Sequence, residues 1–365
     1  MTGNQTGNLQ KQKYASLVEM LEGLEGRTAI ELQRTPDPDA MGAAMAIQHI
    51  CSIVNPELEM DITHYSRLSH PMNILMKKKL DIQMRCYNNG SPSPDDYDNF
   101  IFVDHSGKTS QWFSNGRMSY ERVVCIVDHH DVNEALPEGM NGNLRHLDRR
   151  VVGASCSIIT DYFMNGLMDD LKMEDDFTRT AAGLMLGIRS DTKYLIKNSK
   201  QLDHKAHSYL SDFIDVKDID EIENPQWPSR WISIQGRAMV SRETRNGMTV
   251  AMADYITPEE HDALAVAADQ LLMEECTQTA VVVGIQPEIY DITVRSKSPT
   301  LEMSDFLKER FGHIEGARYG GKDGAGGVQI PNAAFSDFCF NGRNKEDHLE
   351  LTKREIYSML FEDKE

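Results

Sequence analysis

Carboxylates and imidazoles are concentrated in four short polar segments of this sequence. Asp37 and Asp39 stand in TPDPDAMG, Asp104 in IFVDHSG, Asp128 with His129 and His130 in IVDHHDVN, and Asp191 in GIRSDT. Aspartate and histidine side chains suit Mn²⁺ and similar ions that prefer octahedral coordination. Two such ions lying close together need about this many ligands, with one carboxylate shared between them. The residue types therefore indicate a metal site.

The segments around these residues predict the frame that would bring them together. We expect strands at 28–33, 99–106 and 122–130 and helices at 39–54 and 177–188. Three of the four polar segments follow a strand, and an open parallel sheet binds its ligands at the carboxyl ends of its strands. Each carboxylate alone is more simply a turn or helix-capping residue. Five carboxylates and two imidazoles in such places favour one shared site.

The order of the predicted elements indicates two domains. Strands alternate with helices over the first part of the chain, which predicts an α/β fold with a doubly wound, mostly parallel sheet. A polar stretch containing Pro225 and Pro228 predicts a linker, and a smaller C-terminal α/β domain follows it, with the active cleft expected between the two. The expected parts are a loose tail at 1–14, a first domain at 15–195, a linker at 196–234, a second domain at 235–343 and a C-terminal helix at 344–365.

Composition narrows the class of protein. The chain has 365 residues, and its formal charge of 38 − 57 = −19 argues against an extended contact with long nucleic acid, but not against a small phosphorylated ligand. No apolar run approaches the roughly 18 residues of a membrane span. The N-terminus lacks the apolar core of a signal peptide. The six cysteines form no CxxC pair, and several stand in apolar runs. We therefore expect a cytoplasmic protein with reduced thiols and no membrane association.

The four polar segments, in their order and spacing, resemble the four motifs of the DHH phosphoesterase superfamily, which is named for the Asp-His-His triplet. The C-terminal RYGGKDGAGGVQI resembles the glycine-rich motif of the associated DHHA1 domain. LSHPMN, at residues 68–73, resembles a segment of the branch that degrades very short RNAs and dinucleotides, the nanoRNases, to which RecJ-type exonucleases are related. The likeness covers roughly residues 15–340.

This resemblance implies a set of metal ligands and catalytic residues. The implied ligands are Asp37, Asp39, Asp104, His129 and Asp191, which would hold two ions of Mn²⁺, or alternatively Mg²⁺, with Asp104 between them. Asp128 would orient the imidazole of the metal-binding histidine, as carboxylates commonly do. His130 would face the scissile phosphate. Asp128, His129 and His130 are thus the expected catalytic triplet.

The sequence departs from the family pattern at two positions. Gln33 stands where many relatives have a metal-binding histidine four residues before the first aspartate. An amide oxygen binds Mn²⁺ more weakly than imidazole does, so we expect Gln33 to be a weak ligand and one ion to be loosely held. Lys322 stands where the glycine-rich motif usually has histidine, and a lysine meets a phosphate as a point charge.

The C-terminal domain is expected to hold the rest of the substrate. Five glycines lie among the eight residues 320–327, and backbone N–H groups in such a segment can approach a phosphate closely. A flexible turn is the simpler alternative for this segment. The expected substrate-binding residues are Arg295, Ser296, Arg318, Gly320, Gly321 and Lys322.

The function implied is that of a metal-dependent exonuclease. It would hydrolyse short single-stranded RNA or DNA oligonucleotides and dinucleotides to mononucleotides. Within the hydrolases, a phosphatase for a small nucleotide such as 3′-phosphoadenosine 5′-phosphate and a cyclic-dinucleotide phosphodiesterase stay open as alternatives. A nucleotide-binding regulator without turnover is an alternative of another class, and Gln33 is the feature that favours it. RNA or DNA preference, polarity, and a monomer or a homodimer also stay open.

Overall fold

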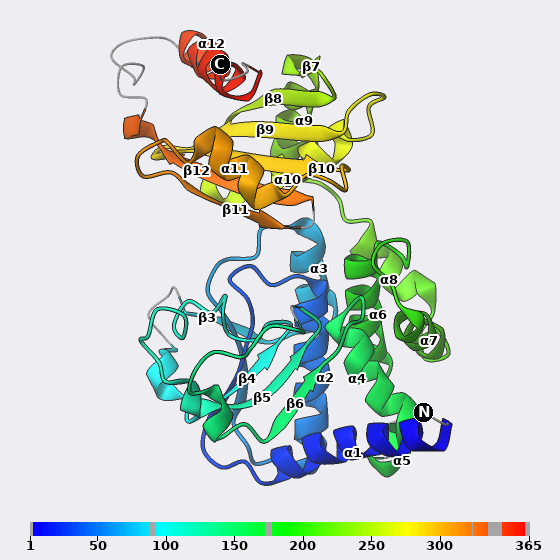
Figure 1. Cartoon of the computed structure of the whole chain (residues 1–365). Helices are drawn as coiled ribbons and strands as arrows, with labels where there is room; N and C mark the ends of the chain where they lie inside the picture. The colour runs from blue at the N-terminus through cyan, green and yellow to red at the C-terminus, as the bar shows by residue number, and fades with distance from the viewer. Residues whose placement is uncertain are drawn as a thin grey trace. The chain divides into compact units, whose positions relative to one another are not determined.

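The computed structural model describes residues 3–87, 92–130, 132–171, 177–322, 324–334 and 345–361. The chain divides into two compact units, an N-terminal unit, Met1–Pro225, and a C-terminal unit, Gln226–Glu365 (Figure 1). Each unit contains one sheet of six strands. Within the part of the chain that is described, no helix has the length and apolar character needed to cross a membrane.

Sheet A of the N-terminal unit is parallel throughout, in the order β3-β2-β1-β4-β5-β6. Its strands are β1 (Thr28–Glu31), β2 (Met60–His64), β3 (Met84–Cys86), β4 (Asn99–Val103), β5 (Val123–Asp128) and β6 (His146–Arg149). The chain builds outward from β1 in one direction and then returns to place β4 on its other side. Ligands of doubly wound sheets bind outside the carboxyl ends of the strands at this switch. The predicted fold class is confirmed.

Helices cover one face of sheet A. They are α1 (Gly3–Glu22), α2 (Pro38–Val54), α3 (Pro71–Lys79), α4 (Ser155–Tyr162), α5 (Met168–Leu171), α6 (Thr178–Thr192), α7 (Gln201–Leu210) and α8 (Val216–Glu223), with a π-helical turn, η5 (Phe163–Leu167), before α5. Helices α2 and α6 pack closely because both have glycine at the crossing. A Cβ on Gly42 would lie only 2.3 Å from the carbonyl oxygen of Gly183. This contact holds together the two helices that carry Asp39 and Asp191.

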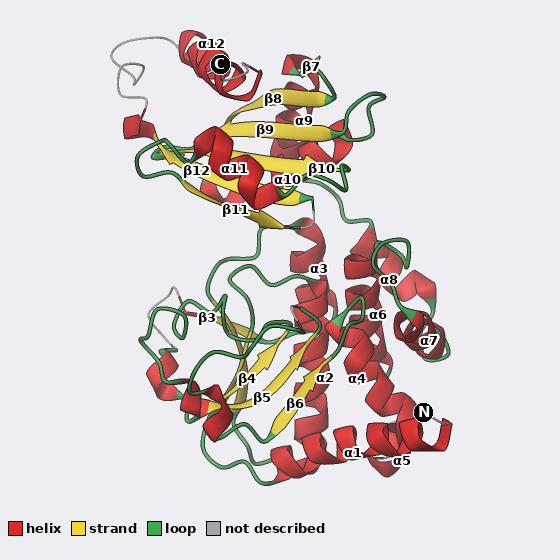
Figure 2. Cartoon of the chain, viewed as in Figure 1, coloured by secondary structure: helices red, strands yellow, loops and turns green. Residues whose placement is uncertain are grey.

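Aromatic side chains fill the other face of sheet A. Among the described residues, the connections from β4 to β5 and from β5 to β6 contain only the 3₁₀ turns η3 (Tyr120–Arg122) and η4 (Met140–Gly142), and a further turn, η2 (Pro94–Asp96), precedes β4. Figure 2 shows loops on this side of the sheet and helices on the other. The buried cluster includes Tyr65, Tyr87, Tyr97, Phe100, Phe102 and Phe113. The helical layer of a doubly wound fold is therefore present on one face and replaced by aromatic loops on the other.

The structure differs from the predicted domain boundaries at both ends of the first domain. The expected loose tail at 1–14 is helical from Gly3, and α1 buries Leu17 and Leu21 in the core of the N-terminal unit. The expected linker at 196–234 contains α7, α8 and the start of α9 (Ser229–Ser241). The polar residues of this stretch lie on the outer faces of amphipathic helices, and the inner faces of these helices are apolar. Buried residues on those inner faces are Ala206, Leu210, Ile219 and Ile222.

The C-terminal unit is built on sheet B, in the order β11-β12-β10-β9-β8-β7. Its strands are β7 (Glu243–Arg245), β8 (Met248–Tyr255), β9 (Thr279–Ile285), β10 (Ile289–Ser296), β11 (Arg318–Lys322) and β12 (Ala325–Pro331). Only β8 and β9 pair in parallel. Helices α9 and α10 (His261–Leu271), the latter preceded by the 3₁₀ turn η7 (Pro258–Glu260), cover one face. Helices α11 (Met303–Phe311) and α12 (Lys345–Phe361) cover the other.

Candidate metal centre and substrate-binding face

Asp104 follows β4 directly and adopts a backbone conformation that turns the chain sharply. Its φ of 63° lies in the left-handed region, which aspartate tolerates better than most residues. Its N–H donates to the carbonyl of Val127 at 2.9 Å, so the turn is tied to β5. The residue is 1% exposed. The end of β4 therefore places a buried carboxylate beside the end of β5.

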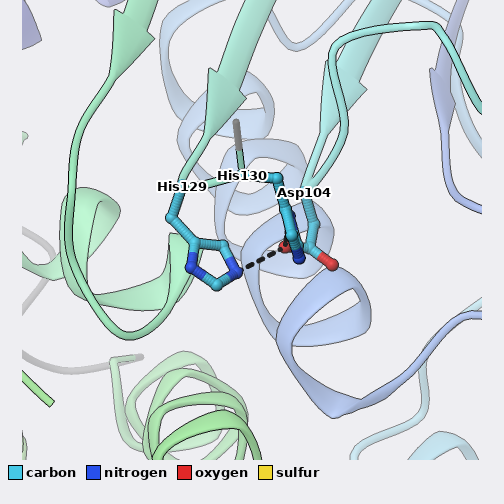
Figure 3. A group of neighbouring side chains, drawn as sticks. All are labelled: Asp104, His129 and His130. Carbon is cyan, nitrogen blue, oxygen red and sulfur yellow. Dashed lines mark ion pairs between the residues drawn. The ribbon is translucent and has the colours of Figure 1, made fainter. Parts of the chain in front are cut away.

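His129 and His130 follow β5, and their rings lie next to Asp104 (Figure 3). Nε2 of His129 lies 3.2 Å from Oδ1 of Asp104, and Nδ1 of His130 lies 3.5 Å from the same oxygen. The two ring centroids are 4.1 Å apart. Nδ1 of His129 lies 3.2 Å from the carbonyl oxygen of Val152 and donates to it, so in the neutral ring the lone pair of Nε2 points toward Asp104. That is the tautomer a metal-binding imidazole requires.

Asp39 lies in the first turn of α2, beside the point where α4 begins. Its Oδ2 accepts a hydrogen bond of 2.6 Å from the N–H of Ser155, and its Oδ1 accepts one of 2.8 Å from the N–H of Cys156. The positive end of the α4 dipole therefore faces this carboxylate and stabilises its charge. The same bonds fix its direction, and Oδ2 of Asp39 lies 3.8 Å from Nε2 of His129.

Asp191 reaches the same point from α6. The predicted helix ended before this residue, whereas α6 runs to Thr192 and carries Asp191 in its last turn. Its Oδ2 lies 3.3 Å from Nε2 of His129. Asp39, Asp104, His129 and Asp191 each offer one ligand atom, and these four atoms all lie within 4.8 Å of one another. We call these four residues the metal centre.

The chemistry of the metal centre fits a divalent cation. Within the described residues, the buried Nε2 of His129 makes no hydrogen bond, although three carboxylates surround it. A buried nitrogen without a partner is costly unless something fills the space that it faces. Three carboxylate oxygens and one imidazole nitrogen are the donors that Mn²⁺ and Mg²⁺ accept.

The pKa shifts of the side chains in the metal centre also fit a site for a divalent cation. Burial, together with the charge of Asp37, raises the pKa of Asp191 to about 7 and raises the pKa of Asp104 as well. Burial opposes protonation of His129, but contacts with Asp104 and Asp191 outweigh it and raise the pKa of His129 to about 12. The carboxylates repel one another, and the imidazole takes up a proton in response. A cation in their midst would relieve the same repulsion.

Asp37 and Gln33 lie beside the metal centre. Asp37 caps α2, accepting a hydrogen bond of 2.9 Å from the N–H of Ala40, and it joins no group of described side chains close enough to share an ion. Gln33 donates from Nε2 to Oδ2 of Asp104 at 2.7 Å and to the carbonyl of Asp104 at 3.3 Å. Since both of its partners are acceptors, the amide nitrogen faces them. Gln33 therefore holds Asp104 in place, where the sequence suggested an oxygen ligand.

Asp128 supports the other histidine of the triplet. Its Oδ1 lies 3.0 Å from the N–H of His130 and 3.1 Å from Nδ1 of the same residue, while its Oδ2 accepts from the hydroxyl of Ser106 at 2.8 Å. Burial would raise the pKa of Asp128, but these hydrogen bonds hold it below its ordinary value. We expected Asp128 to orient the metal-binding imidazole. The Val152 carbonyl has that role, and Asp128 orients His130.

The partners that the sequence did not indicate are mostly backbone groups. The carbonyl of Val152 and the N–H groups of Ser155 and Cys156 all come from the segment between β6 and the first turn of α4. Backbone groups are present at every residue, so they leave no pattern in the sequence. In the sequence, only the small residues Gly153, Ala154 and Ser155 indicate that this segment packs close to neighbouring segments of the fold.

The glycine-rich segment of the C-terminal unit forms a β-hairpin, where the sequence suggested a cradle-like loop or a flexible turn. Strands β11 and β12 pair antiparallel, with Gly320 opposite Gly327 and Gly321 opposite Gly326. A Cβ on Gly321 would lie 2.4 Å from Cγ of Met303 on α11, so this glycine lets the helix pack closely. Gly320 points the other way, and no described atom lies within 4 Å of its Cβ position.

The predicted substrate-binding residues divide between the two faces of sheet B. Alternate residues of a strand point to opposite faces, and the register places Arg295, Arg318 and Gly320 on the face away from α11. Ser296 lies on the α11 side, and its hydroxyl meets that of Thr279 at 2.9 Å, which is a structural contact. Lys322 pairs with Ala325 through its backbone, and its side chain lies outside the described residues.

Comparison with known proteins agrees with the resemblance of the four polar segments to the motifs of the DHH superfamily. Residues 27–188 match the model of the DHH family, N-terminal domain. The uncharacterized protein MJ1633 of Methanocaldococcus jannaschii is 29% identical over 327 residues, which are 90% of this chain and 62% of that protein. This chain thus spans less than two thirds of that relative.

Two solved structures were found to be similar to this chain to different degrees. An exopolyphosphatase-related protein from Bacteroides fragilis superposes with a TM-score of 0.66 at 14% identity, covering 94% of this chain and 98% of its own. At this identity the likeness shows the fold alone. The pGpG-specific phosphodiesterase PggH of Vibrio cholerae covers 91% of this chain and 98% of its own at 12% identity, and its TM-score of 0.37 is too low to bear on function. The parallel sheet and the polar residues at its switch point agree with the match of residues 27–188 to the DHH family, N-terminal domain.

Proposed function

We propose that this protein is a metal-dependent phosphodiesterase that hydrolyses short single-stranded oligonucleotides and dinucleotides to mononucleotides. The observation that carries the proposal is the metal centre, in which Nε2 of His129 faces three carboxylates and makes no hydrogen bond within the described residues. Its four ligands come from two strand ends and two helices, so the fold positions them before any ion binds. That arrangement supports catalysis over the alternative of a regulator without turnover.

The ion proposed for this centre is Mn²⁺, with Mg²⁺ as the alternative. Asp39, Asp104, His129 and Asp191 would hold it. When bound, such an ion supplies a Lewis acid that lowers the pKa of water and polarises a phosphoryl oxygen. A second ion would have to bind between Asp37 and Asp104, where Oδ2 of Asp104 already accepts from Gln33. We therefore infer one firmly held ion and one that binds weakly.

His130 and Asp128 of the triplet have the remaining catalytic roles. His130 is 29% exposed at its side chain, and Asp128 holds its Nδ1. The carboxylate fixes the orientation of the ring, so Nε2 of His130 is left to face a non-bridging oxygen of the phosphodiester. Water oxygen forms the new bond to phosphorus, and the bond from phosphorus to the leaving sugar oxygen breaks. The proton lost by water balances the one gained by the leaving alkoxide.

The choice of short substrates follows from charge. The net charge of −19 repels a long polyanion, whereas a dinucleotide meets only the local surface where it binds. Arg295 and Arg318, on the face of sheet B away from α11, supply positive charge for a phosphate. Gly320 leaves space there for the rest of a nucleotide.

The experiment is incubation of the full chain with Mn²⁺ and end-labelled RNA and DNA, from dinucleotides upward, with products resolved over time. A ladder of shortening products ending in mononucleotides is expected, and it also gives polarity and length preference. 3′-Phosphoadenosine 5′-phosphate and a cyclic dinucleotide are the comparison substrates. Turnover of either of these without turnover of linear dinucleotides would overturn the proposed substrate class.

A further inference from the structure

The face of sheet B on which α9 and α10 pack carries a histidine held by a buried carboxylate. Nδ1 of His261, the first residue of α10, lies 2.6 Å from Oδ2 of Asp291 on β10. Asp291 is 1% exposed, whereas the side chain of His261 is 44% exposed. Gln286 donates to the same carboxylate oxygen at 2.7 Å. The carboxylate therefore fixes one nitrogen of a partly exposed ring, and Nε2 is the nitrogen that a ligand could contact.

The position of His261 is unfavourable for a purely structural residue. The contact with Asp291 raises the pKa of His261, so the ring is a cation more readily than a free histidine. A cation at the first residue of a helix is opposed by the helix dipole. Gln286 donates to the same carboxylate, so Asp291 is held from two sides. The buried carboxylate keeps a partly exposed histidine in a fixed orientation and favours its charged form, which suits an anion-binding group.

A side-chain-free surface lies next to this pair. Asp291 on β10 pairs with Gln329 on β12, and Gln329 pairs in turn with Arg318 on β11. In the adjacent row of the same face, Gly327 pairs with Gly320. The only described atom within 4 Å of a Cβ on Gly327 is a backbone oxygen at 3.7 Å, and Gly320 has none. We call this cross-strand pair the glycine floor.

Positive charge borders the glycine floor on more than one side. Arg318 is exposed and belongs to the row of Asp291. Arg295 belongs to the row beyond the floor, and its Nε lies 3.6 Å from the half-exposed Asp269 on α10. A flat surface without side chains, bordered by three donors that can carry positive charge, suits a ligand with a planar ring and a phosphate.

We propose that His261, oriented by Asp291, contacts the phosphate of a nucleotide that rests on the glycine floor. The inference deepens the proposed function and rests on it for the identity of the substrate, because a mononucleotide is also the expected product. His261 is thereby a binding residue for substrate phosphate in the C-terminal unit. None of the predicted site residues has this role.

The test is calorimetric titration of the full chain, in metal-free buffer, with adenosine 5′-monophosphate and with adenosine. The wild-type chain is expected to bind the nucleotide more tightly than the nucleoside. His261→Asn should weaken binding of the nucleotide about tenfold, on the scale of one charge-assisted hydrogen bond, and leave adenosine unchanged. His313→Asn is the matched control, since His313 is an exposed histidine of the same unit.

Asp291→Asn keeps the size of the buried side chain and removes the charge that favours the imidazolium. Like His261→Asn, it is expected to weaken binding of the nucleotide. Binding of adenosine to each variant shows whether the glycine floor is intact. Equal affinity of wild type and His261→Asn for the nucleotide would overturn the inference. So would a wild-type chain that binds adenosine as tightly as its monophosphate.

A second assay separates this inference from the proposed function. Mn²⁺-dependent hydrolysis of bis(p-nitrophenyl) phosphate needs the metal centre and has no nucleotide to place on the floor. His261→Asn is expected to raise the KM for a dinucleotide more than the KM for bis(p-nitrophenyl) phosphate. Absence of all hydrolysis by the wild-type chain would refute the proposed function, while the nucleotide titration would still decide the role of His261.

Discussion

The metal centre lies among buried side chains, whereas the glycine floor is an exposed surface. At the metal centre, Asp39 and Asp104 are at most 1% exposed, and each ligand is held by hydrogen bonds or by packed helices. At the floor, strand register alone brings Gly320, Gly327 and Arg318 to one face. A buried charged site concentrates electrostatic effects, and solvent weakens them at an exposed one. Substitutions should therefore act strongly on chemistry in the N-terminal unit and more gently on binding in the C-terminal unit.

The largest expected effect is the loss of a metal ligand. Asp104→Asn and His129→Ala should each lower Mn²⁺-dependent kcat at least about a hundredfold, because groups that only support ligands already cost ten- to a hundredfold. Steady-state hydrolysis of a dinucleotide measures this, and far-UV circular dichroism checks that the fold persists. Near wild-type turnover by Asp104→Asn would remove the basis of the assignment.

The next effect concerns a buried carboxylate on the aromatic face of sheet A. Burial raises the pKa of Glu31 from 4.5 to about 7. The folded state therefore holds the proton more tightly than the unfolded chain, and this stabilisation is present below about pH 4.5 and is lost as pH rises through about 7. Glu31→Gln should stabilise the N-terminal unit at about pH 8, by an amount on the order of 3 kcal/mol, and should have little effect at about pH 4.5.

Urea unfolding of both proteins across this pH range measures the difference in free energy of unfolding. Glu57→Gln is the control, because Glu57 is exposed in the same unit. If the difference between wild type and Glu31→Gln were the same at every pH, Glu31 would not titrate in this range.

A smaller effect is expected at the edge of the metal centre. Gln33→His replaces the donor that holds Asp104 by a nitrogen ligand and should tighten the weaker of the two Mn²⁺ sites about tenfold. Electron paramagnetic resonance of free Mn²⁺ gives stoichiometry and affinity directly, without a hydrolysis assay. An unchanged binding curve would mean that Gln33 acts only through Asp104 and that no second ion binds beside it.

The smallest effect is expected on the exposed face. Arg318→Ala should raise the KM for a dinucleotide about two- to fivefold and leave kcat unchanged, as is typical for an exposed charge. The rise should shrink as salt concentration increases. Arg354→Ala, at an exposed arginine of α12, is the matched control. A large fall in kcat for Arg318→Ala would contradict the division between chemistry and binding.

The sequence was sufficient for the parts of the fold that follow from hydrophobic pattern. Strands β1, β4 and β5 and helix α2 lie where apolar runs or small residues predicted them. Strands β3, β6 and β7 went unpredicted because three or four residues, such as HLDR in β6, carry too little pattern. Helices α7 and α8 looked like a linker because their exposed faces dominate their composition.

The candidate site was predictable as a set of residue types and less so as a set of contacts. Four of the five predicted ligands have atoms within 4.8 Å of one another, because α2, α6 and the ends of β4 and β5 meet at one edge of the parallel sheet. Which group orients which imidazole depended on the backbone of Val152, which has no sequence signature. The donor role of Gln33 and the pairing of His261 with Asp291 depend on tertiary contacts alone.

The most direct test of the central claim is Mn²⁺ binding to the full chain after treatment with a chelator, compared between wild type and His129→Ala. One tight site is expected in the wild-type chain and should be lost in the variant, with dinucleotide hydrolysis returning as this site fills. Hydrolysis that returns before the tight site is occupied, or tight binding that survives in His129→Ala, would contradict the claim that these four residues form the catalytic metal centre.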